Sequence, residues 1–333
     1  MKTFKPKFNM LAAAVLALSL AAPVNAADFT FRYGNSQPEQ APRSQSMIYF
    51  KNLVEDASGG RITVDNYFGG VLGTEREMMD QVATGALDGT RGGKFTDANP
   101  AYNIFLMPFL VGGWDEMLRL INSKFANRIN RGARKNGYHI PALGISQGFR
   151  VHTNTKRPLA TIADFNGLKM RVPGQDVYLE TAKSLGENPQ TLDYSEVYQA
   201  MKTGVIDGQD NAYSNVWDYK IYEVSKYMSI TNYSTGPDPF IVRLDWYEQL
   251  PNDLKAIFDD AARRAMAYSD GLNRASEQNY VEQLCTVLEC NTVAAAELGK
   301  MATATKPVYD IFIGKGHFTQ ADVDEAKRIA QGE

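Results

Sequence analysis

The hydrophobic pattern of the chain switches repeatedly between a strand-like and a helix-like period. Residues 29–33 alternate apolar and polar side chains and predict a strand, and residues 41–57 follow as a helix. Residues 62–68 predict a second strand, and Thr74 caps a helix that runs to about Thr84. Strands that alternate with helices in this order predict α/β lobes with largely parallel sheets.

The same alternation continues toward the C-terminus. Residues 251–288 contain good helix formers and no internal proline, and Gly271 is a candidate position for a bend. At 1.5 Å per residue this helix would be roughly 55 Å long, enough to reach across two lobes. Strands are also predicted at 138–145, 149–154, 168–172, 205–207, 227–232 and 240–243, with helices at 114–135, 177–185 and 195–202.

The N-terminus carries the three regions of a secretory signal peptide. Three lysines before residue 8 precede an apolar stretch over residues 10–22, and Val24-Asn25-Ala26 supplies small residues at a cleavage site. The apolar stretch is short for a membrane span, which disfavours the alternative of an uncleaved anchor. We therefore expect residues 1–26 to be a signal peptide that is cleaved after Ala26, and the mature chain to be exported.

The length and charge of the mature chain narrow its class. About 307 residues remain, more than one core usually organises, so two lobes are expected. Removal of residues 1–26 changes the balance from 35 Lys and Arg against 38 Asp and Glu to 32 against 38, a net charge of -6. The basic residues are scattered, so we expect no nucleic-acid partner. An acidic protein that binds anions must do so at a local site.

The two cysteines, Cys285 and Cys290, lie five residues apart. An oxidising compartment favours a disulfide between them, provided that the chain turns there to satisfy the bond geometry. Two thiols without nearby histidines are weak evidence for a metal site. We therefore expect a disulfide and no metal.

The chain lacks the signatures of most enzymes. Residues 144–148 match the GxSxG nucleophile pattern around Ser146, but that motif requires a following helix, and residues 149–153 look like a strand. The three histidines show no metal-ligand spacing, and neither a P-loop nor a GxGxxG fingerprint occurs. We therefore expect a binding protein without a cofactor, with a secreted serine hydrolase that uses Ser146 as the alternative.

Arg171 is the leading candidate for an anion-binding residue. It stands near the end of the predicted strand 168–172, before Pro173-Gly174. In open α/β sheets, ligands bind outside the carboxyl ends of the strands. A guanidinium also matches a carboxylate with two parallel hydrogen bonds. The alternative is a surface arginine in an ordinary salt bridge.

Several segments together resemble the substrate-binding proteins of TRAP transporters, the tripartite ATP-independent periplasmic family. The most specific is Gly-Leu-Lys-Met-Arg-Val-Pro at 167–173, because the family's anion-binding arginine occupies the place of Arg171, immediately before Val-Pro. The resemblance spans nearly the whole mature chain. The other matching segments are 107–110, 147–150, 194–198, 207–211 and 222–224.

This resemblance implies an α/β, two-lobed periplasmic binding protein with a hinge and discontinuous lobes. We expect lobe I to hold 27–147 plus 237–276 and lobe II to hold 148–236 plus 277–333, with the long helix spanning both. It further implies a periplasmic protein, expected to be a monomer, that closes on its ligand and delivers it to an integral-membrane TRAP permease. A receptor that feeds a sensor is the alternative.

The resemblance also assigns ligand-binding roles to individual residues. Arg150 matches a second arginine beside the ligand, Asn211 a polar side chain that bonds the carboxylate, and Tyr194 an aromatic wall. The alternatives are a structural ion pair, a helix cap and a core aromatic, respectively. In lobe I, Ser36 and Gln37 follow the first strand, where the family's ligand contacts begin.

Three further residues are candidates for contacts with the rest of the ligand. Arg91 would lie where the family's third strand enters the cleft and could take a second carboxylate, unless it pairs with Asp88 or Asp97. Tyr213 and Trp217 could supply hydrogen-bonding and stacking surface.

The expected ligand is a small organic acid. Arg91 and Gly174 depart from the sialic-acid-binding members of the family, which disfavours sialic acid. We expect a sugar acid or a similar hydroxy-carboxylate, with a C4-type dicarboxylate as the alternative.

Overall fold

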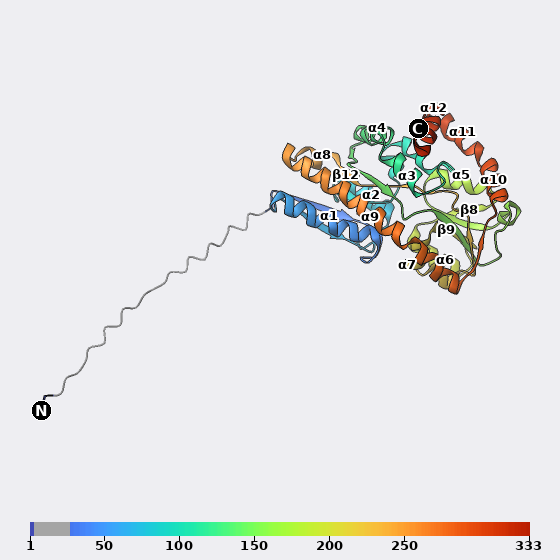
Figure 1. Cartoon of the computed structure of the whole chain (residues 1–333), viewed down its shortest axis with the longest axis horizontal. Helices are drawn as coiled ribbons and strands as arrows, with labels where there is room; N and C mark the ends of the chain where they lie inside the picture. The colour runs from blue at the N-terminus through green and yellow to red at the C-terminus, as the bar shows by residue number, and fades with distance from the viewer. Residues whose placement is uncertain (3–26) are drawn as a thin grey trace.

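The computed structural model describes residues 1–2 and 27–333 and shows a two-lobed α/β protein (Figure 1). The predicted signal peptide lies outside the described residues apart from Met1 and Lys2, and so does its cleavage site at Ala26. Each lobe is built around one large sheet, so the predicted fold class is confirmed.

Lobe I is organised by a five-stranded sheet in the order β2-β1-β3-β12-β4. β1 runs parallel to β2 and β3, whereas β12 runs antiparallel to β3 and β4. Phe31 and Tyr33, two residues apart on β1, face a core of aromatic rings because alternate strand positions point to the same face. The strands are β1 Phe29–Gly34, β2 Ile62–Tyr67, β3 Gly89–Thr90, β4 Tyr138–His139 and β12 Ile241–Arg243.

Lobe II is organised by a six-stranded sheet in the order β13-β10-β6-β9-β7-β8. β7 runs parallel to β8 and β9, and β6 is antiparallel to β9 and β10. The strands are β6 Arg150–Asn154, β7 Lys169–Val172, β8 Asn188–Thr191, β9 Gly208–Ala212, β10 Tyr227–Ile230 and β13 Glu289–Thr292.

Two crossing segments join the lobes beside a short antiparallel pair, β5 Leu143–Ile145 and β11 Pro237–Pro239. The chain enters lobe II after β5 and leaves it before β11. Gln147 (φ 57°) lies in the first crossing and Asn232 (φ 44°) in the second. Left-handed backbone is uncommon outside glycine and persists where surrounding structure enforces it. The hinge is therefore conformationally constrained at both crossings.

Helices surround the two sheets, as Figure 1 shows. The α-helices are α1 Pro42–Ser58, α2 Glu75–Thr84, α3 Trp114–Ile121, α4 Lys124–Gly132, α5 Asp176–Ser184, α6 Tyr194–Lys202, α7 Tyr213–Asp218, α8 Leu244–Glu248, α9 Asn252–Val287, α10 Ala295–Ala304, α11 Lys306–Gly314 and α12 Gln320–Gln331. Short 3-10 turns are η1 Phe95–Asp97, η2 Pro100–Leu106, η3 Ala133–Asn136, η4 Ile162–Phe165 and η5 Ile221–Val224.

The longest helix, α9, runs for 36 residues and continues through Gly271. It packs against α1 of lobe I and α7 of lobe II. Its buried residues in lobe I include Phe258, Ala262 and Met266, which recur every four residues on one face. The predicted long helix that spans both lobes is confirmed.

Three predicted elements differ from the structure. The helix predicted at 114–135 is divided into α3, α4 and η3, because the Ser123 side chain accepts from Ala126 N at 3.2 Å and starts a new helix. The strand predicted at 138–145 is two strands in different sheets, with Pro141 between them. The strand predicted at 205–207 begins at Gly208, because Gly204 (φ 74°) and the next residues turn the chain at the end of α6.

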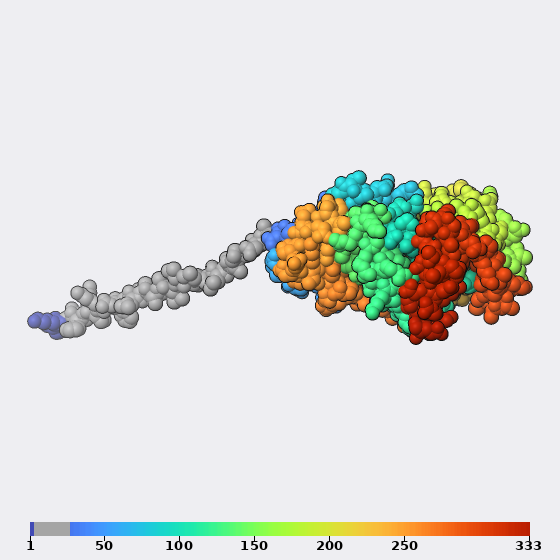
Figure 2. All heavy atoms as spheres, turned by 90° about the horizontal axis from the view of Figure 1, so that it is seen from above, coloured from blue at the N-terminus to red at the C-terminus, as the bar shows by residue number. Residues whose placement is uncertain are grey.

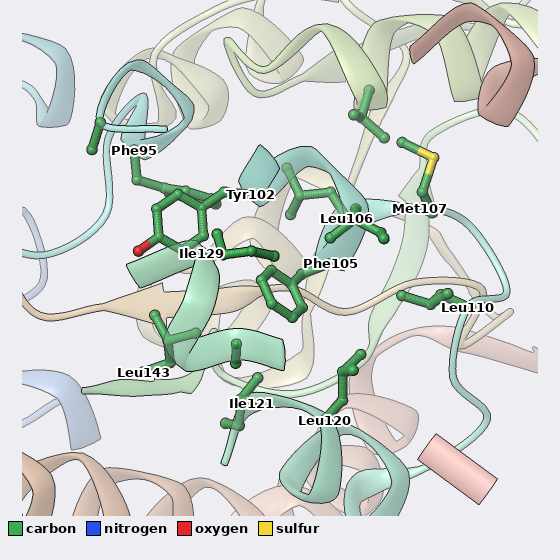
Figure 3. Packing of buried hydrophobic residues seen from close by; sticks show 14 of the residues in the cluster. Phe95, Tyr102, Phe105, Leu106, Met107, Leu110, Leu120, Ile121, Ile129 and Leu143 are labelled. Carbon is green, nitrogen blue, oxygen red and sulfur yellow. The ribbon is translucent and has the colours of Figure 1, made fainter. Parts of the chain in front are cut away.

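The C-terminal helices contact both lobes, since α10 and α11 pack against η4 and α5 of lobe II. Helix α12 packs against α3 of lobe I, and Arg119 of α3 donates to Ala330 O at 2.8 Å. Val323, Ala326 and Ala330 are buried in the same cluster as the lobe I residues around η2, part of which Figure 3 shows. Figure 2 shows this C-terminal segment in red beside the green segment that contains α3 and α4.

The disulfide predicted between Cys285 and Cys290 is present. Cys285 lies near the end of α9, and Cys290 lies in β13, which pairs with β10. The chain turns at Leu288, and the two Cα atoms are 5.5 Å apart, within the range that a disulfide requires. Among residues 27–333, no helix has the length and apolar character that a bilayer span needs.

Candidate functional site

A cavity of about 570 Å³ lies between the lobes. Loops at the carboxyl ends of β1, β2 and β3 line it from lobe I, and loops after β7, β8 and β9 line it from lobe II. In both sheets, the ends of parallel strands therefore converge on one space, as expected for a ligand site in an open α/β sheet. The side chains used below are Ser36, Gln37, Arg43, Glu75, Gln147, Arg150, Arg171, Gln175, Tyr178, Tyr194, Asn211, Asn215 and Tyr219.

Arg171 is a buried cation without an acidic partner. Its side chain is 5% exposed, its Nε donates to Leu192 O at 2.9 Å, and its guanidinium lies 5.0 Å from the ring centre of Tyr194. Within the described part of the chain, no carboxylate lies within 4.0 Å of it. Burial lowers the pKa of Arg171 to about 10, so it is still charged at neutral pH.

Arg150, by contrast, already has a carboxylate partner. Its Nε donates to Asp210 Oδ2 at 2.6 Å, its Nη2 donates to Asp210 O at 2.6 Å, and its guanidinium lies 4.4 Å from the ring centre of Tyr178. Burial opposes the charged forms, but their attraction raises the pKa of Arg150 and lowers that of Asp210 to about 2. Tyr233 donates its hydroxyl to the same Asp210 oxygen. Arg150 therefore forms the ion pair that was the alternative to a ligand-binding role, and it also lines the cavity.

A group of four amides lies across the middle of the cavity. Asn215 Nδ2 donates to Asn211 Oδ1 at 2.8 Å, and Gln37 Nε2 from lobe I lies 3.4 Å from Asn215 Oδ1. With its oxygen turned toward lobe I, the Gln147 amide accepts from Gln37 Nε2 at 2.6 Å and from Arg43 Nη2 at 2.8 Å. These amides supply both donors and acceptors to a ligand with hydroxyl groups.

Arg43 is a site residue that the sequence interpretation missed. It lies in the first turn of α1 and is 3% exposed, and its guanidinium binds Asp238 Oδ2 at 3.0 Å and Glu75 Oε1 at 3.1 Å. Burial opposes its charge, but these two carboxylates raise the pKa of Arg43. Glu75 Oε1 also accepts from Ser36 Oγ at 2.9 Å. The available signal was an arginine directly after the start of the helix that follows β1.

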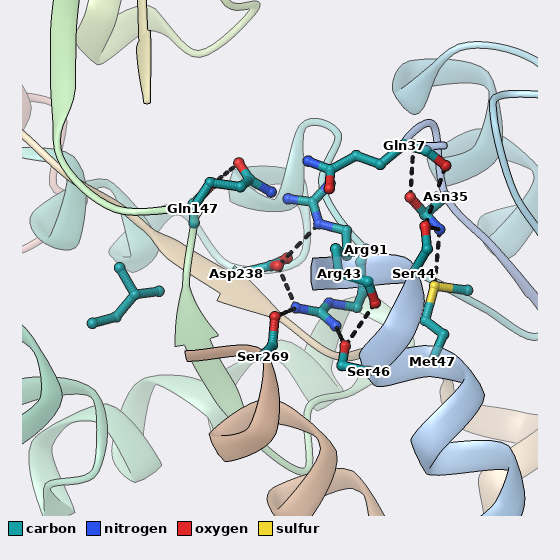
Figure 4. A network of polar contacts seen from close by, with 12 residues as sticks. Asn35, Gln37, Arg43, Ser44, Ser46, Met47, Arg91, Gln147, Asp238 and Ser269 are labelled. Carbon is teal, nitrogen blue, oxygen red and sulfur yellow. Dashed lines mark hydrogen bonds and ion pairs between the residues drawn. The ribbon is translucent and has the colours of Figure 1, made fainter. Parts of the chain in front are cut away.

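Arg91 lies behind the cavity and does not line it. Its Nη2 pairs with Asp238, and its Nη1 donates to Ser46 Oγ, an arrangement that Figure 4 shows. Asp238 therefore lies between Arg43 and Arg91, which together lower its pKa against the effect of burial. The alternative considered for Arg91 was an ion pair with Asp88 or Asp97, and its carboxylate partner is instead Asp238 of the hinge strand β11. Asp88 instead pairs with Arg32 and Arg243.

Tyr213 and Trp217, predicted to contact the ligand, also lie outside the cavity lining. Tyr213 is buried and donates to Asn232 Oδ1 at 3.0 Å in the second crossing. Trp217 stacks on Tyr222 at 4.8 Å. Both belong to α7, whose Asn215 and following residue Tyr219 face the cavity.

Tyr194 lies beside Arg171, with its ring centre 5.0 Å from the guanidinium, and lines the cavity. Its hydroxyl is buried without a hydrogen-bond partner among the described residues, and burial raises its pKa. A buried hydroxyl without a partner is costly, so a ligand oxygen at this point would relieve the cost.

Ser146 lacks the surroundings of a catalytic serine. It lines the cavity, but the three histidines bond elsewhere, His139 to Asp259, His152 to Thr231 and His317 to Asn103. Burial also lowers the pKa of His152 to about 4. No cluster of metal-ligating side chains occurs among the described residues.

Comparison with known proteins assigns the chain to a protein family. A family model described as bacterial extracellular solute-binding protein, family 7, matches residues 33–315. The chain belongs to this family. A relative described as a solute-binding protein from Chromohalobacter salexigens is 30% identical over 321 residues, which cover 94% of each chain. The sequence-based resemblance to TRAP substrate-binding proteins is confirmed.

Solved structures of TRAP periplasmic solute-binding proteins share the fold of this family 7 chain. One from Haemophilus influenzae, with bound L-gulonate, superposes with a TM-score of 0.86 at 26% identity and covers 90% of this chain and 99% of that one. Another from Roseobacter denitrificans, with bound β-D-glucuronate, has a TM-score of 0.84 at 25% identity and covers 91% and 99%.

Proposed function

We propose that this family 7 protein is the periplasmic receptor of a TRAP transporter for a sugar acid. The observation that carries the proposal is Arg171, a buried guanidinium without a carboxylate partner in the described part of the chain. A buried cation without a partner is costly, and a bound carboxylate compensates that cost. The bound L-gulonate and β-D-glucuronate of two similar proteins support the choice of ligand.

In this proposal the carboxylate is held by lobe II. The two terminal nitrogens of Arg171 donate to its oxygens in parallel, and Asn211 and Arg150 lie close enough on the same sheet to add donors. Tyr194 forms one side of this carboxylate-binding position. Arg150 is already paired with Asp210, so it adds less positive charge than Arg171.

The hydroxyl groups of the acid would reach the amides and lobe I. Gln37, Asn215 and Gln147 offer donors and acceptors, and Glu75 offers a carboxylate acceptor. A cavity of about 570 Å³ is of the size usual for small-molecule sites. Because both lobes contact the ligand, binding shifts the population toward the closed form.

The closed receptor would then dock on an integral-membrane permease of the TRAP type in the periplasm, after export and cleavage at Ala26. Residue chemistry supports binding without catalysis, because Ser146 has no histidine base among the described residues. The dicarboxylate alternative loses its support, because Arg91, its expected second anchor, lies behind the cavity paired with Asp238.

A thermal-shift and calorimetry panel tests the proposal. D-Glucuronate, D-galacturonate and L-gulonate are compared with succinate and with uncharged D-glucose. A ligand at 100 times its dissociation constant stabilises a fold by about 2.7 kcal/mol, so a bound sugar acid raises the melting temperature. Stabilisation by glucose with none by the acids would overturn the proposal, and stabilisation by succinate alone would establish the dicarboxylate alternative.

A further inference from the structure

Besides the amide contact between Gln37 and Asn215, two hydrogen bonds from lobe II side chains to lobe I backbone carbonyls join the lobes across the cavity. The Tyr219 hydroxyl, at the end of α7 in lobe II, donates to Ser36 O in lobe I at 3.1 Å. Gln175 Nε2, just before α5 in lobe II, donates to Gly93 O in lobe I at 2.8 Å. In each bond a lobe II side chain reaches a lobe I backbone carbonyl. Neither bond needs a ligand atom between its partners.

Glycines make the Gln175 contact geometrically feasible. Gly92 (φ 86°) and Gly93 (φ 69°) adopt left-handed backbone after β3, and a Cβ on Gly93 would lie 2.7 Å from Glu75 O. The tight turn therefore brings Gly93 O toward lobe II. In lobe II, Gly174 follows the end of β7 and leaves open space, since the nearest atom to an added Cβ would be Arg76 Nη2 of lobe I at 3.7 Å.

Tyr219 is linked by side-chain packing to Arg171, the proposed carboxylate-binding residue. Its ring packs edge-on against Tyr194 at 4.7 Å, and Tyr194 in turn lies 5.0 Å from the Arg171 guanidinium. Burial raises the pKa of Tyr219 to about 12, so the hydroxyl keeps its donor proton at neutral pH. A ligand that fixes Tyr194 thus also restricts the ring that bonds to lobe I.

We propose that Gln175 and Tyr219 are positioning residues that hold the lobes closed, so that their cross-cleft bonds set how fast a bound acid leaves. The acid in this inference is the ligand of the proposed function, on which it rests. Loss of a bond that exists only in the closed form speeds opening, whereas entry into the open cleft is unaffected. From the net worth of one hydrogen bond, each loss should raise koff about 2- to 10-fold.

The test compares Tyr219→Phe, Gln175→Met and the double variant with wild type. Stopped-flow binding of D-glucuronate gives kon and koff, and melting curves verify that each variant folds. Tyr280→Phe and Gln249→Met are the matched controls, because their side chains bond within one lobe, to Asp218 and to Asp245 O. The expected result is a raised koff with unchanged kon in both single variants, a larger rise in the double variant, and no change in the controls.

A ligand-free measurement separates positioning from direct contact. The only two cysteines form the disulfide, so spin labels at Asp80→Cys on α2 and Lys202→Cys on α6 report the distance between lobes. Tyr219→Phe and Gln175→Met should shift ligand-free protein toward longer distances. An unchanged distance distribution, or a change in kon with koff unchanged, overturns the inference. If wild type binds no sugar acid, the proposed function fails, and this distance measurement still decides the inference.

Discussion

At the scale of single residues, the four arginines around the cleft differ in whether a carboxylate neutralises their positive charge. Arg43 and Arg91 share Asp238, and Arg150 holds Asp210, whereas Arg171 contacts only a carbonyl and an aromatic ring among the described residues. Burial is similar for all four, so the difference lies in their partners. Among the described residues, Arg171 is therefore the one of the four whose charge has no carboxylate partner.

Substitution of Arg171→Met should weaken binding of D-glucuronate strongly. Truncating one partner of a buried charge pair costs about 2–5 kcal/mol, so the dissociation constant should rise at least 30-fold. The ligand-free variant should be at least as stable as wild type, because the removed buried charge has no acidic partner among the described residues. Calorimetry and urea unfolding check both statements, with exposed Arg263→Met as the control. A dissociation constant within threefold of wild type would contradict the assignment.

Substitution of Asp238→Asn should destabilise the ligand-free protein. The variant leaves Arg43 and Arg91 buried without their shared carboxylate, and breaking such a pair costs about 3–5 kcal/mol. Urea unfolding measures the loss. The matched control is Asp245→Asn, whose carboxylate is 68% exposed and should contribute at most about 1 kcal/mol. Equal stability of the two variants would refute the structural role of Asp238.

At the scale of elements, sequence periodicity predicted most helices and strands because each buries one face. The periodicity failed where a side chain bonded to the backbone and interrupted a helix. Ser123 does this, because it caps a new helix within a continuous apolar pattern. The candidate site shows a different reason for failure. Whether Arg43 or Arg91 faces the cavity depends on Asp238, which lies 195 and 147 residues away along the chain. No local pattern contains that information, whereas the strand-end position of Arg171 is local.

The disulfide at the end of α9 should stabilise that end specifically. Closing a loop of about five residues removes unfolded-state entropy worth roughly 2 kcal/mol in the chain-entropy model. The Cys285→Ser, Cys290→Ser double variant should lose about that much free energy of unfolding. Hydrogen exchange should locate the effect in the last turns of α9 and in β13, with α1 unchanged. Equal loss of protection throughout α1 would argue against a local effect.

At the scale of the whole molecule, Asp270 couples the long helix to the hinge. Its Oδ1 accepts from Ile145 N of β5 at 2.7 Å, and Arg91 and Asp238 are the charged groups that act on it. Burial raises the pKa of Asp270 to about 7. In the unfolded chain the same carboxyl titrates near pH ~4, so between these values the folded protein holds a proton that the unfolded chain has lost.

The stability of the protein should therefore fall as the pH rises from about 4 to about 7 because of this group. The side chain introduced by Asp270→Asn cannot titrate, so the melting temperature of the variant should rise relative to that of wild type as the pH increases across that window. Melting curves from pH 4.5 to 8 measure the difference, with Asp245→Asn as the control. Asp210, whose pKa is lowered to about 2, loses its contribution only below this range. A constant difference between wild type and Asp270→Asn would contradict the prediction.

The return of α12 to lobe I has a consequence for the order of folding. Met117 and Leu120 of α3 are buried in the same cluster as Val323 and Ala326 of α12. A chain that emerges from its N-terminus cannot complete this core until its last residues are present. The core of lobe I therefore includes residues of both the first strand and the last helix of the chain, and it should be completed only after the C-terminus has been synthesised.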